Sequence, residues 1–254
     1  MEIAGKTALV TGSGSGIGRT IAVRLGRDGA AVVVNDLEEE TGSETVDLIT
    51  RAGSKASFTH GDVTEDADVK AAVAYAESTF GGLDILVNNA GGFPYPVFPD
   101  ADLEHWSRSL DLNLRSAMVA IHYAVRAMER RGAGAIVNIA SSAGHGLAPH
   151  PGPEYAVAKA GIIRLTACLA PLADRGIRVN CVSPHTVGTP AVRGRIAELK
   201  ADGEELPGPL QDVLLEPEEV ADAVVDFIED ESLAGRVLVL VGGREPELLS
   251  SSSS

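Results

Sequence analysis

Short apolar runs alternate with longer segments of helical periodicity along the chain, and this alternation limits the possible folds more than any other feature. The runs are rich in Val, Ile and Leu with little polar alternation, which is typical of strands buried on both faces. We expect seven strands, at Thr7–Val10, Ala31–Val34, Ala56–Phe58, Ile85–Val87, Ala135–Ile139, Val179–Val182 and Val237–Val241.

The segments between these runs are long enough to form helices. We expect helices at Ile17–Arg27, Glu39–Arg51, Asp66–Phe80, Leu103–Arg130, Tyr155–Leu172 and Pro217–Glu229. Strands that alternate with helices form a parallel sheet with right-handed crossovers and a helix layer on each face. The sequence therefore predicts an α/β fold, a single doubly wound domain over residues 1–249 with a parallel seven-stranded sheet. Thr189–Glu216 interrupts the alternation, and we expect an excursion with short helices there.

Charge and composition exclude several kinds of partner. The formal net charge is −15, so we expect no binding to nucleic acid or to anionic membranes. No apolar run reaches the roughly 20 residues that span a bilayer, and the first residues lack the layout of a signal peptide. We therefore expect a cytoplasmic protein. Cys168 and Cys181 lack metal-ligand spacing, which favours reduced, buried thiols and no metal site. Ser250–Ser254 is predicted to be a disordered tail.

A glycine-rich turn, Thr11–Gly18, follows the first predicted strand and opens the first predicted helix. Glycines permit a tight turn and let backbone amides approach a pyrophosphate, whose charge the helix N-terminus stabilises. The sequence therefore predicts a dinucleotide site whose contacts are Gly12, Ser15, Gly16, Ile17 and Gly18.

Asp36 ends the second predicted strand, about 20 residues after the glycines, where a ribose-binding acid is expected. Its carboxylate can accept hydrogen bonds from ribose hydroxyls and would repel a 2′-phosphate. No Lys or Arg precedes Gly16 in the turn to neutralise such a phosphate. These features favour NAD(H) over NADP(H), although Arg19, just past the turn, leaves the second coenzyme open.

Tyr155 and Lys159 are four residues apart in a segment of helical periodicity, so their side chains lie on one face. A nearby ammonium favours the phenolate form of a tyrosine, which can then act as a general acid or base. A Tyr-x-x-x-Lys pair alone is common on helix surfaces. Two further motifs make the pair more specific here. Asn88-Asn89-Ala90-Gly91 follows the fourth predicted strand, and Asn138-Ile139-Ala140-Ser141-Ser142 closes the fifth.

With these motifs in this order, the sequence resembles the short-chain dehydrogenase/reductase family over about Lys6 to Gly243. The resemblance implies a Rossmann-type fold and a homotetramer. It also implies that Ser142, thirteen residues before Tyr155, binds the substrate oxygen, with Ser141 as the alternative serine. Tyr155 would exchange the proton, and Lys159 would bind the nicotinamide ribose and lower the tyrosine pKa. Asn113 matches the family asparagine that bends a helix and holds a water of the proton relay.

The resemblance also implies contacts with the rest of the coenzyme. Asp62 and Val63 match a pair that contacts adenine, and Val187 and Thr189 match residues at the carboxamide end. The turn beside the adenosine is matched by Asn89, Ala90 and Gly91. The chain departs from the family at Pro184-His185, where the family has Pro-Gly.

These residues suggest an enzyme that interconverts a secondary alcohol and a ketone by hydride transfer with NAD. The main alternative is a catalytically silent protein that senses the dinucleotide, since a fold does not establish activity. A nucleotide-sugar epimerase or dehydratase is a third hypothesis, which the absence of a C-terminal substrate domain disfavours. We expect the substrate walls at Gly92–Asp100, Gly144–Glu154 and Thr189–Leu215, whose apolar content favours an apolar small molecule.

Overall fold

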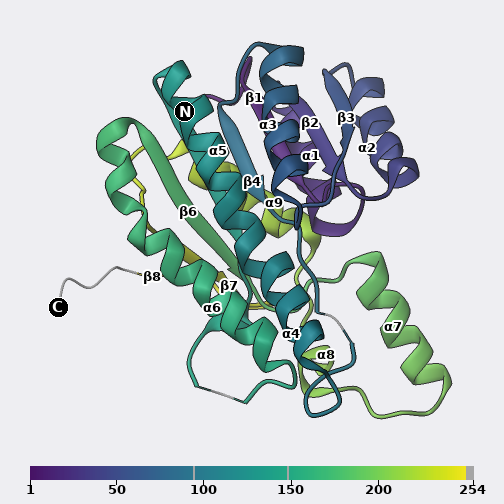
Figure 1. Ribbon diagram of the computed structural model, residues 1–254. Coiled ribbons are helices and arrows are strands. Elements are labelled where there is room, and N and C mark those ends of the chain that lie inside the picture. The colour runs from purple at the N-terminus through teal and green to yellow at the C-terminus, as the bar shows by residue number, and fades with distance from the viewer. Residues whose placement is uncertain (94, 148, 250–254) are drawn as a thin grey trace.

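The computed structural model describes residues 1–93, 95–147 and 149–249. One sheet lies between two layers of helices (Figure 1). Its strand order is β3-β2-β1-β4-β5-β6-β7-β8, parallel throughout except for the pairing of β7 with β8. The strands are β1 (Thr7–Thr11), β2 (Ala31–Asp36), β3 (Ala56–His60), β4 (Ile85–Asn88), β5 (Gly134–Ile139), β6 (Ile177–Pro184), β7 (Val237–Leu240) and β8 (Glu247–Leu249).

The helices connect these strands and cover both faces of the sheet. The α-helices are α1 (Gly16–Arg27), α2 (Glu39–Arg51), α3 (Asp66–Phe80), α4 (Leu103–Leu110), α5 (Ser116–Arg131), α6 (Pro153–Cys168), α7 (Pro190–Ala201), α8 (Gly208–Gln211) and α9 (Pro217–Glu229). A π-helical turn, Asp111–Arg115, joins α4 to α5. Short 3₁₀ helices lie at Ser142–Gly144 and Ala170–Arg175.

Successive strand residues face two different cores, as expected for a sheet buried on both sides. In β1, Ala8 and Val10 pack against the layer of α1, α2 and α9, whereas Leu9 packs against the layer of α3 and α5. β2, β4 and β5 divide their residues in the same way. The continuous Val, Ile and Leu runs of the sequence are thus explained by burial on both faces.

The doubly wound α/β fold and the seven predicted strands are confirmed, but the prediction of an entirely parallel seven-stranded sheet is incomplete. An eighth strand, β8, pairs antiparallel with β7, with Val237 opposite Leu249. β8 has three residues, two of them exposed, so its sequence has no hydrophobic pattern from which the strand could be predicted. The predicted helix over Leu103–Arg130 contains the π-helical turn, and the region after Thr189 contains the twelve-residue α7.

Three connections gather at the carboxyl edge of the parallel strands, where doubly wound folds bind ligands (Figure 1). They are the β4–α4 loop, the β5–α6 loop and the excursion between β6 and α9 that carries α7 and α8. Of the two thiols predicted to be buried, Cys181 is buried in β6, but Cys168 is exposed at the end of α6. The predicted serine tail, Ser250–Ser254, lies outside the described residues. Across the described residues, every helix is too short or too polar to cross a bilayer.

Candidate active site

The glycine turn places backbone amides at the start of α1. Gly12 and Gly16 have φ angles of +61° and +53°, a conformation that favours glycine. Gly18 packs so closely that a Cβ would overlap the Gly12 carbonyl oxygen. Ser15 is the N-cap of α1, and its side chain makes no capping hydrogen bond. The first-turn amides, from Gly16 to Gly18 and including Ile17, are therefore not capped by Ser15 and suit an anion such as a pyrophosphate.

Asp36 lies at the end of β2 and faces the glycine turn. Its carboxylate accepts hydrogen bonds from the Gly14 amide at 2.7 Å and the Glu38 amide at 3.1 Å. A Cβ on Gly14 would come within 2.8 Å of this carboxylate, so the turn and the acid fit closely. The negative charge thus sits where the adenosine ribose of a dinucleotide would lie.

The guanidinium of Arg19, the cation that left NADP(H) open, is occupied by the protein itself. It donates to the Gly14 carbonyl at 2.8 Å, to the Thr45 hydroxyl at 3.0 Å and to the Thr41 carbonyl at 3.1 Å. It also pairs with the Glu44 carboxylate at 2.9 Å. Arg19 therefore ties the glycine turn to α2.

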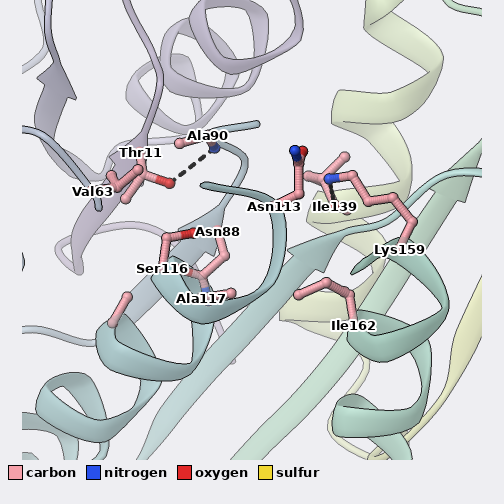
Figure 2. Close-up of a pocket in the computed structure, with 11 residues that line it drawn as sticks. Thr11, Val63, Asn88, Ala90, Asn113, Ser116, Ala117, Ile139, Lys159 and Ile162 are labelled. Carbon is pink, nitrogen blue, oxygen red and sulfur yellow. Dashed lines mark hydrogen bonds between the residues drawn. The ribbon is translucent and has the colours of Figure 1, made fainter. Parts of the chain in front are cut away.

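Thr11 joins the glycine turn to the loop that follows β4. Its hydroxyl accepts hydrogen bonds from the Asn89 and Ala90 amides, both at 3.1 Å (Figure 2). The Asn89 side chain donates to the carbonyls of Thr11 at 3.0 Å and Gly12 at 2.9 Å. Asn89, Ala90 and the adjoining Gly91 are in this way brought directly against the glycine turn.

The remaining predicted coenzyme contacts reach the same edge from other elements. Val63 lines a small cavity together with Thr11 and Ala90, while the Asp62 carboxylate accepts from the Thr64 amide at 2.8 Å. Thr189 caps α7 and lies against the glycine turn, since its methyl carbon would be 3.5 Å from a Cβ on Gly16. Val187 is buried and pairs with Leu215.

Lys159 is a buried cation on α6. Its side chain is 4% exposed, and its ammonium donates to the Ile139 carbonyl at 3.1 Å. Burial lowers the pKa of Lys159 from 10.5 to about 8, because a charge is less stable away from water. The ammonium and the Asn113 amide lie side by side in Figure 2, and both would contact a Cβ on Gly91.

Asn113 lies in the π-helical turn between α4 and α5 and is buried. Its amide accepts from the Gly92 amide at 3.0 Å and donates to the Gly92 carbonyl, also at 3.0 Å. A cavity of about 10 Å³ beside Asn113 and Lys159 has room for roughly one water molecule. Ile139 and Ser116 are among its other walls. The predicted pairing of Asn113 with Lys159 is therefore present as a spatial arrangement.

Tyr155 lies in the first turn of α6. The Lys159 ammonium lies 5.6 Å from the centre of its ring. Burial raises the pKa of the Tyr155 phenol, and a hydrogen bond with the Ser141 hydroxyl acts in the opposite direction. Ser141, the serine that the spacing argument placed second, is thus the one whose hydroxyl favours the ionised phenol.

Ser141 and Ser142 have different roles in the local backbone. Ser141 follows β5 in an extended conformation and caps the 3₁₀ turn, accepting from the Ala143 amide at 3.2 Å. Ser142 is already inside that turn. Counting back from Tyr155 runs along a loop whose length is not fixed by any secondary structure, so the spacing alone does not decide between the two serines.

The sequence did not reveal which residues contact one another around the site. Of the two histidines in the β5–α6 loop, His145 bonds to the Ser183 hydroxyl at 2.6 Å, whereas His150 stacks on the Tyr155 ring. Phe93 contacts both the His150 and Tyr155 rings. His185, which replaces the family glycine, lies 3.9 Å from the Asp212 carboxylate. Contacts of this kind join loops far apart in the sequence, so no spacing rule reveals them.

Comparisons with known proteins agree with this geometry. The short chain dehydrogenase family model matches residues 6–200. A cyclohexanol dehydrogenase of Acinetobacter sp. is 40% identical over 89% of this chain and 89% of its own length. The (+)-borneol dehydrogenase 2 of Salvia officinalis is 36% identical over 96% and 90%.

Solved structures give the same result. A 7α-hydroxysteroid dehydrogenase complexed with NADH and 7-oxo glycochenodeoxycholic acid superposes with a TM-score of 0.85 at 31% identity, over 98% of this chain and 97% of that one. The family match covers the glycine turn, Tyr155 and Lys159 together. The chain belongs to the short-chain dehydrogenase family and is an oxidoreductase of that family.

Proposed function

We propose that the protein interconverts a ring-bearing secondary alcohol and its ketone with NAD(H), using Tyr155 as the general acid/base. The observation that carries this proposal is the convergence of Ser141, Tyr155 and Lys159 beside the glycine turn, at the carboxyl edge of the sheet. Hydride transfer needs a polarised substrate oxygen and a group that moves the proton, and these side chains supply both.

The residues present fit a nicotinamide dinucleotide. The turn formed by Gly12 and Gly16 and the uncapped start of α1 suit a pyrophosphate, and Asp36 suits the ribose hydroxyls. When bound, the coenzyme would supply the hydride chemistry, with NAD⁺ as the acceptor in oxidation and NADH as the donor in reduction. The Asp36 charge supports NAD(H) as the preferred coenzyme, because it would repel a 2′-phosphate. The bonds from the Arg19 Nε and Nη2 to the glycine turn and α2 also support it, because they hold this cation against the protein.

Each polar side chain then has a defined task. The Tyr155 phenol oxygen takes the alcohol proton in oxidation and returns it in reduction. Because burial raises the pKa of Tyr155, the phenolate needs stabilisation, which the Ser141 hydroxyl and a cationic Lys159 provide. Asn113 holds the loop that carries Gly92 in place beside Lys159. We assign the contact with the substrate oxygen to Ser141 in place of Ser142.

The walls of the site support an apolar ring as the substrate body. Three large apolar or aromatic side chains on the two loops nearest Tyr155 are well exposed: Tyr95 at 77%, Phe98 at 57% and Leu147 at 101%. Exposed apolar side chains around a site favour an apolar ligand. Cyclohexanol and borneol, which name two of the relatives, are both cyclic secondary alcohols.

The test is an NADH absorbance assay of the purified protein with cyclic alcohols of one to four rings. We expect turnover with NAD, no turnover by Tyr155→Phe, and NADH binding by that variant close to wild type. Binding of NADH without turnover on any alcohol or ketone of the panel would instead support the silent sensor, which the dehydrogenase relatives do not favour.

A second comparison tests the serine assignment. Ser141→Ala should lose about 100-fold in kcat/KM, the usual cost of removing one donor to a reacting oxygen. Ser142→Ala is the matched control and should stay within about threefold of wild type, because it removes no such donor. The reverse pattern would return the role to Ser142.

A further inference from the structure

Aromatic rings from two different loops enclose the Tyr155 side chain. Phe93 comes from the β4–α4 loop and His150 from the β5–α6 loop. The Phe93 ring meets the Tyr155 ring edge-on, with centroids 5.5 Å apart, and the His150 ring stacks on Tyr155 at 5.8 Å and 28°. Phe93 and His150 also meet each other at 5.3 Å. The three rings therefore form one mutually contacting cluster.

The backbone holds both of the added rings in place. A Cβ on Gly152 would overlap the Phe93 ring, so this ring packs directly on the Gly152 backbone. The His150 ring is fixed through Nδ1, which lies 3.1 Å from both the amide nitrogen and the carbonyl oxygen of Gly152. One residue before α6 thus positions two rings against Tyr155.

Tyr95 provides an internal contrast. It contacts Phe93 edge-on at 5.3 Å, but its side chain is 77% exposed and it has no recorded ring contact with Tyr155 among the described residues. The cluster therefore has an inner pair that touches Tyr155 and an outer ring that does not.

We propose that Phe93 and His150 form an aromatic clasp that determines which alcohols reach Tyr155, admitting compact alcohols of one or two rings and disfavouring steroid-sized ones. This rests on the proposed function. Centroid separations of 5.3–5.8 Å are contact distances for aromatic rings, so no substrate atom fits between them. The alcohol must approach the phenol from the side that the clasp leaves open, with the clasp as a wall. A compact ring packs against this wall, and a large rigid one collides with it.

Gly152→Ala tests the clasp without altering either ring. The backbone at Gly152, with φ −107° and ψ 90°, is open to alanine, so the added methyl group acts mainly by displacing Phe93, with a looser contact to the Glu154 carboxylate at 3.1 Å. Leu48→Ala, at an exposed position of α2, is the control. Phe93→Ala and His150→Ala remove the rings themselves, and Tyr95→Ala removes only the outer ring.

The measured quantity is the ratio of kcat/KM for a 3β-hydroxysteroid to kcat/KM for cyclohexanol. Gly152→Ala, Phe93→Ala and His150→Ala should each raise this ratio at least about tenfold, the scale on which apolar pocket contacts discriminate. Tyr95→Ala should change it less than Phe93→Ala does, and Leu48→Ala should leave it within about twofold. Thermal unfolding and NADH binding close to wild type would show that the fold and the coenzyme site are intact.

The outcomes separate this inference from the proposed function. A wild-type enzyme that turns over ring alcohols, with ratios unchanged in all three clasp variants, would overturn the clasp alone. If Phe93→Ala fails to fold, Gly152→Ala and His150→Ala still decide the question. A wild-type protein with no turnover on either alcohol would overturn the proposed function and the clasp with it.

Discussion

The buried ammonium of Lys159 costs the protein stability, so replacing Lys159 with methionine should stabilise the unliganded fold while abolishing activity. The side chain is 4% exposed, and burial holds its pKa near 8 instead of 10.5. Methionine has a similar length and no charge, so it can fill the same space without the desolvation penalty.

The magnitude follows from the pKa. Each pKa unit corresponds to about 1.4 kcal/mol, so lowering the Lys159 pKa from 10.5 to about 8 corresponds to a destabilisation of the folded, charged form by roughly 3 kcal/mol. Lys159→Met also loses the hydrogen bond to the Ile139 carbonyl, which reduces the expected stabilisation by about 1 kcal/mol. Lys159→Met should therefore raise the free energy of unfolding by about 2 kcal/mol at pH 7.

The stability difference between Lys159→Met and wild type should depend on pH. Below pH 8 the lysine is charged in both the folded and the unfolded protein, and the full penalty applies. Between about pH 8 and 10.5 the unfolded chain binds the proton and the folded protein does not, so wild-type stability rises with pH. The advantage of Lys159→Met should accordingly shrink as the pH rises through this range.

Urea unfolding of the unliganded proteins at pH 7 and pH 9.5 measures both effects. Lys70→Met, at an exposed position of α3, is the matched control and should show no pH-dependent difference from wild type. The reasoning is refuted if Lys159→Met is less stable than wild type at pH 7, or if its advantage is the same at both pH values.

Three further predictions concern the coenzyme, the fold and the assembly. Asp36→Ala should lower the ratio of kcat/KM for NAD to that for NADP at least about tenfold, because it removes a charge that repels the 2′-phosphate; an unchanged ratio would place coenzyme selection elsewhere. Arg178→Met should lower the free energy of unfolding in urea by about 3 kcal/mol, because the buried Arg178 guanidinium donates to several carbonyls at the end of α9; a change below about 1 kcal/mol would contradict this capping role. For the predicted homotetramer, replacing the exposed Met118 of α5 and Val157 of α6 together with glutamate should reduce the mass measured by light scattering, and an unchanged assembly would exclude these helices as its interface.

The fold and the glycine turn were predictable because their causes are local. Strands buried on two faces need continuous apolar runs, and the turn before α1 needs glycine wherever the backbone has no space for a Cβ, as at Gly18. Such requirements leave their mark on the sequence at the same position. β8 escaped prediction for the converse reason, because an exposed three-residue edge strand places almost no demand on its residues.

The site was predictable only as far as each residue belongs to a helix or strand. Tyr155 and Lys159 share a helix, so their spacing fixes their relation. Ser141 and Ser142 are joined to Tyr155 by a loop, so their spacing alone does not decide which of the two lies beside the phenol. The orientation of the Arg19 side chain depends on α2, which contributes three of its hydrogen-bond acceptors. Residues placed by tertiary packing need the structure.

Asn113 shows how the fold and the site depend on one another. In the π-helical turn the Ser116 amide bonds to the Asp111 carbonyl, five residues back, so the regular α-helical pairing is lost locally. The Asn113 amide compensates by donating to the Ser109 carbonyl at 3.1 Å, while the same side chain makes two bonds with Gly92. An alanine would remove all three bonds at once. The helix irregularity and the position of the β4–α4 loop beside Lys159 therefore have a single cause, which is why an asparagine stands at this place in the helix.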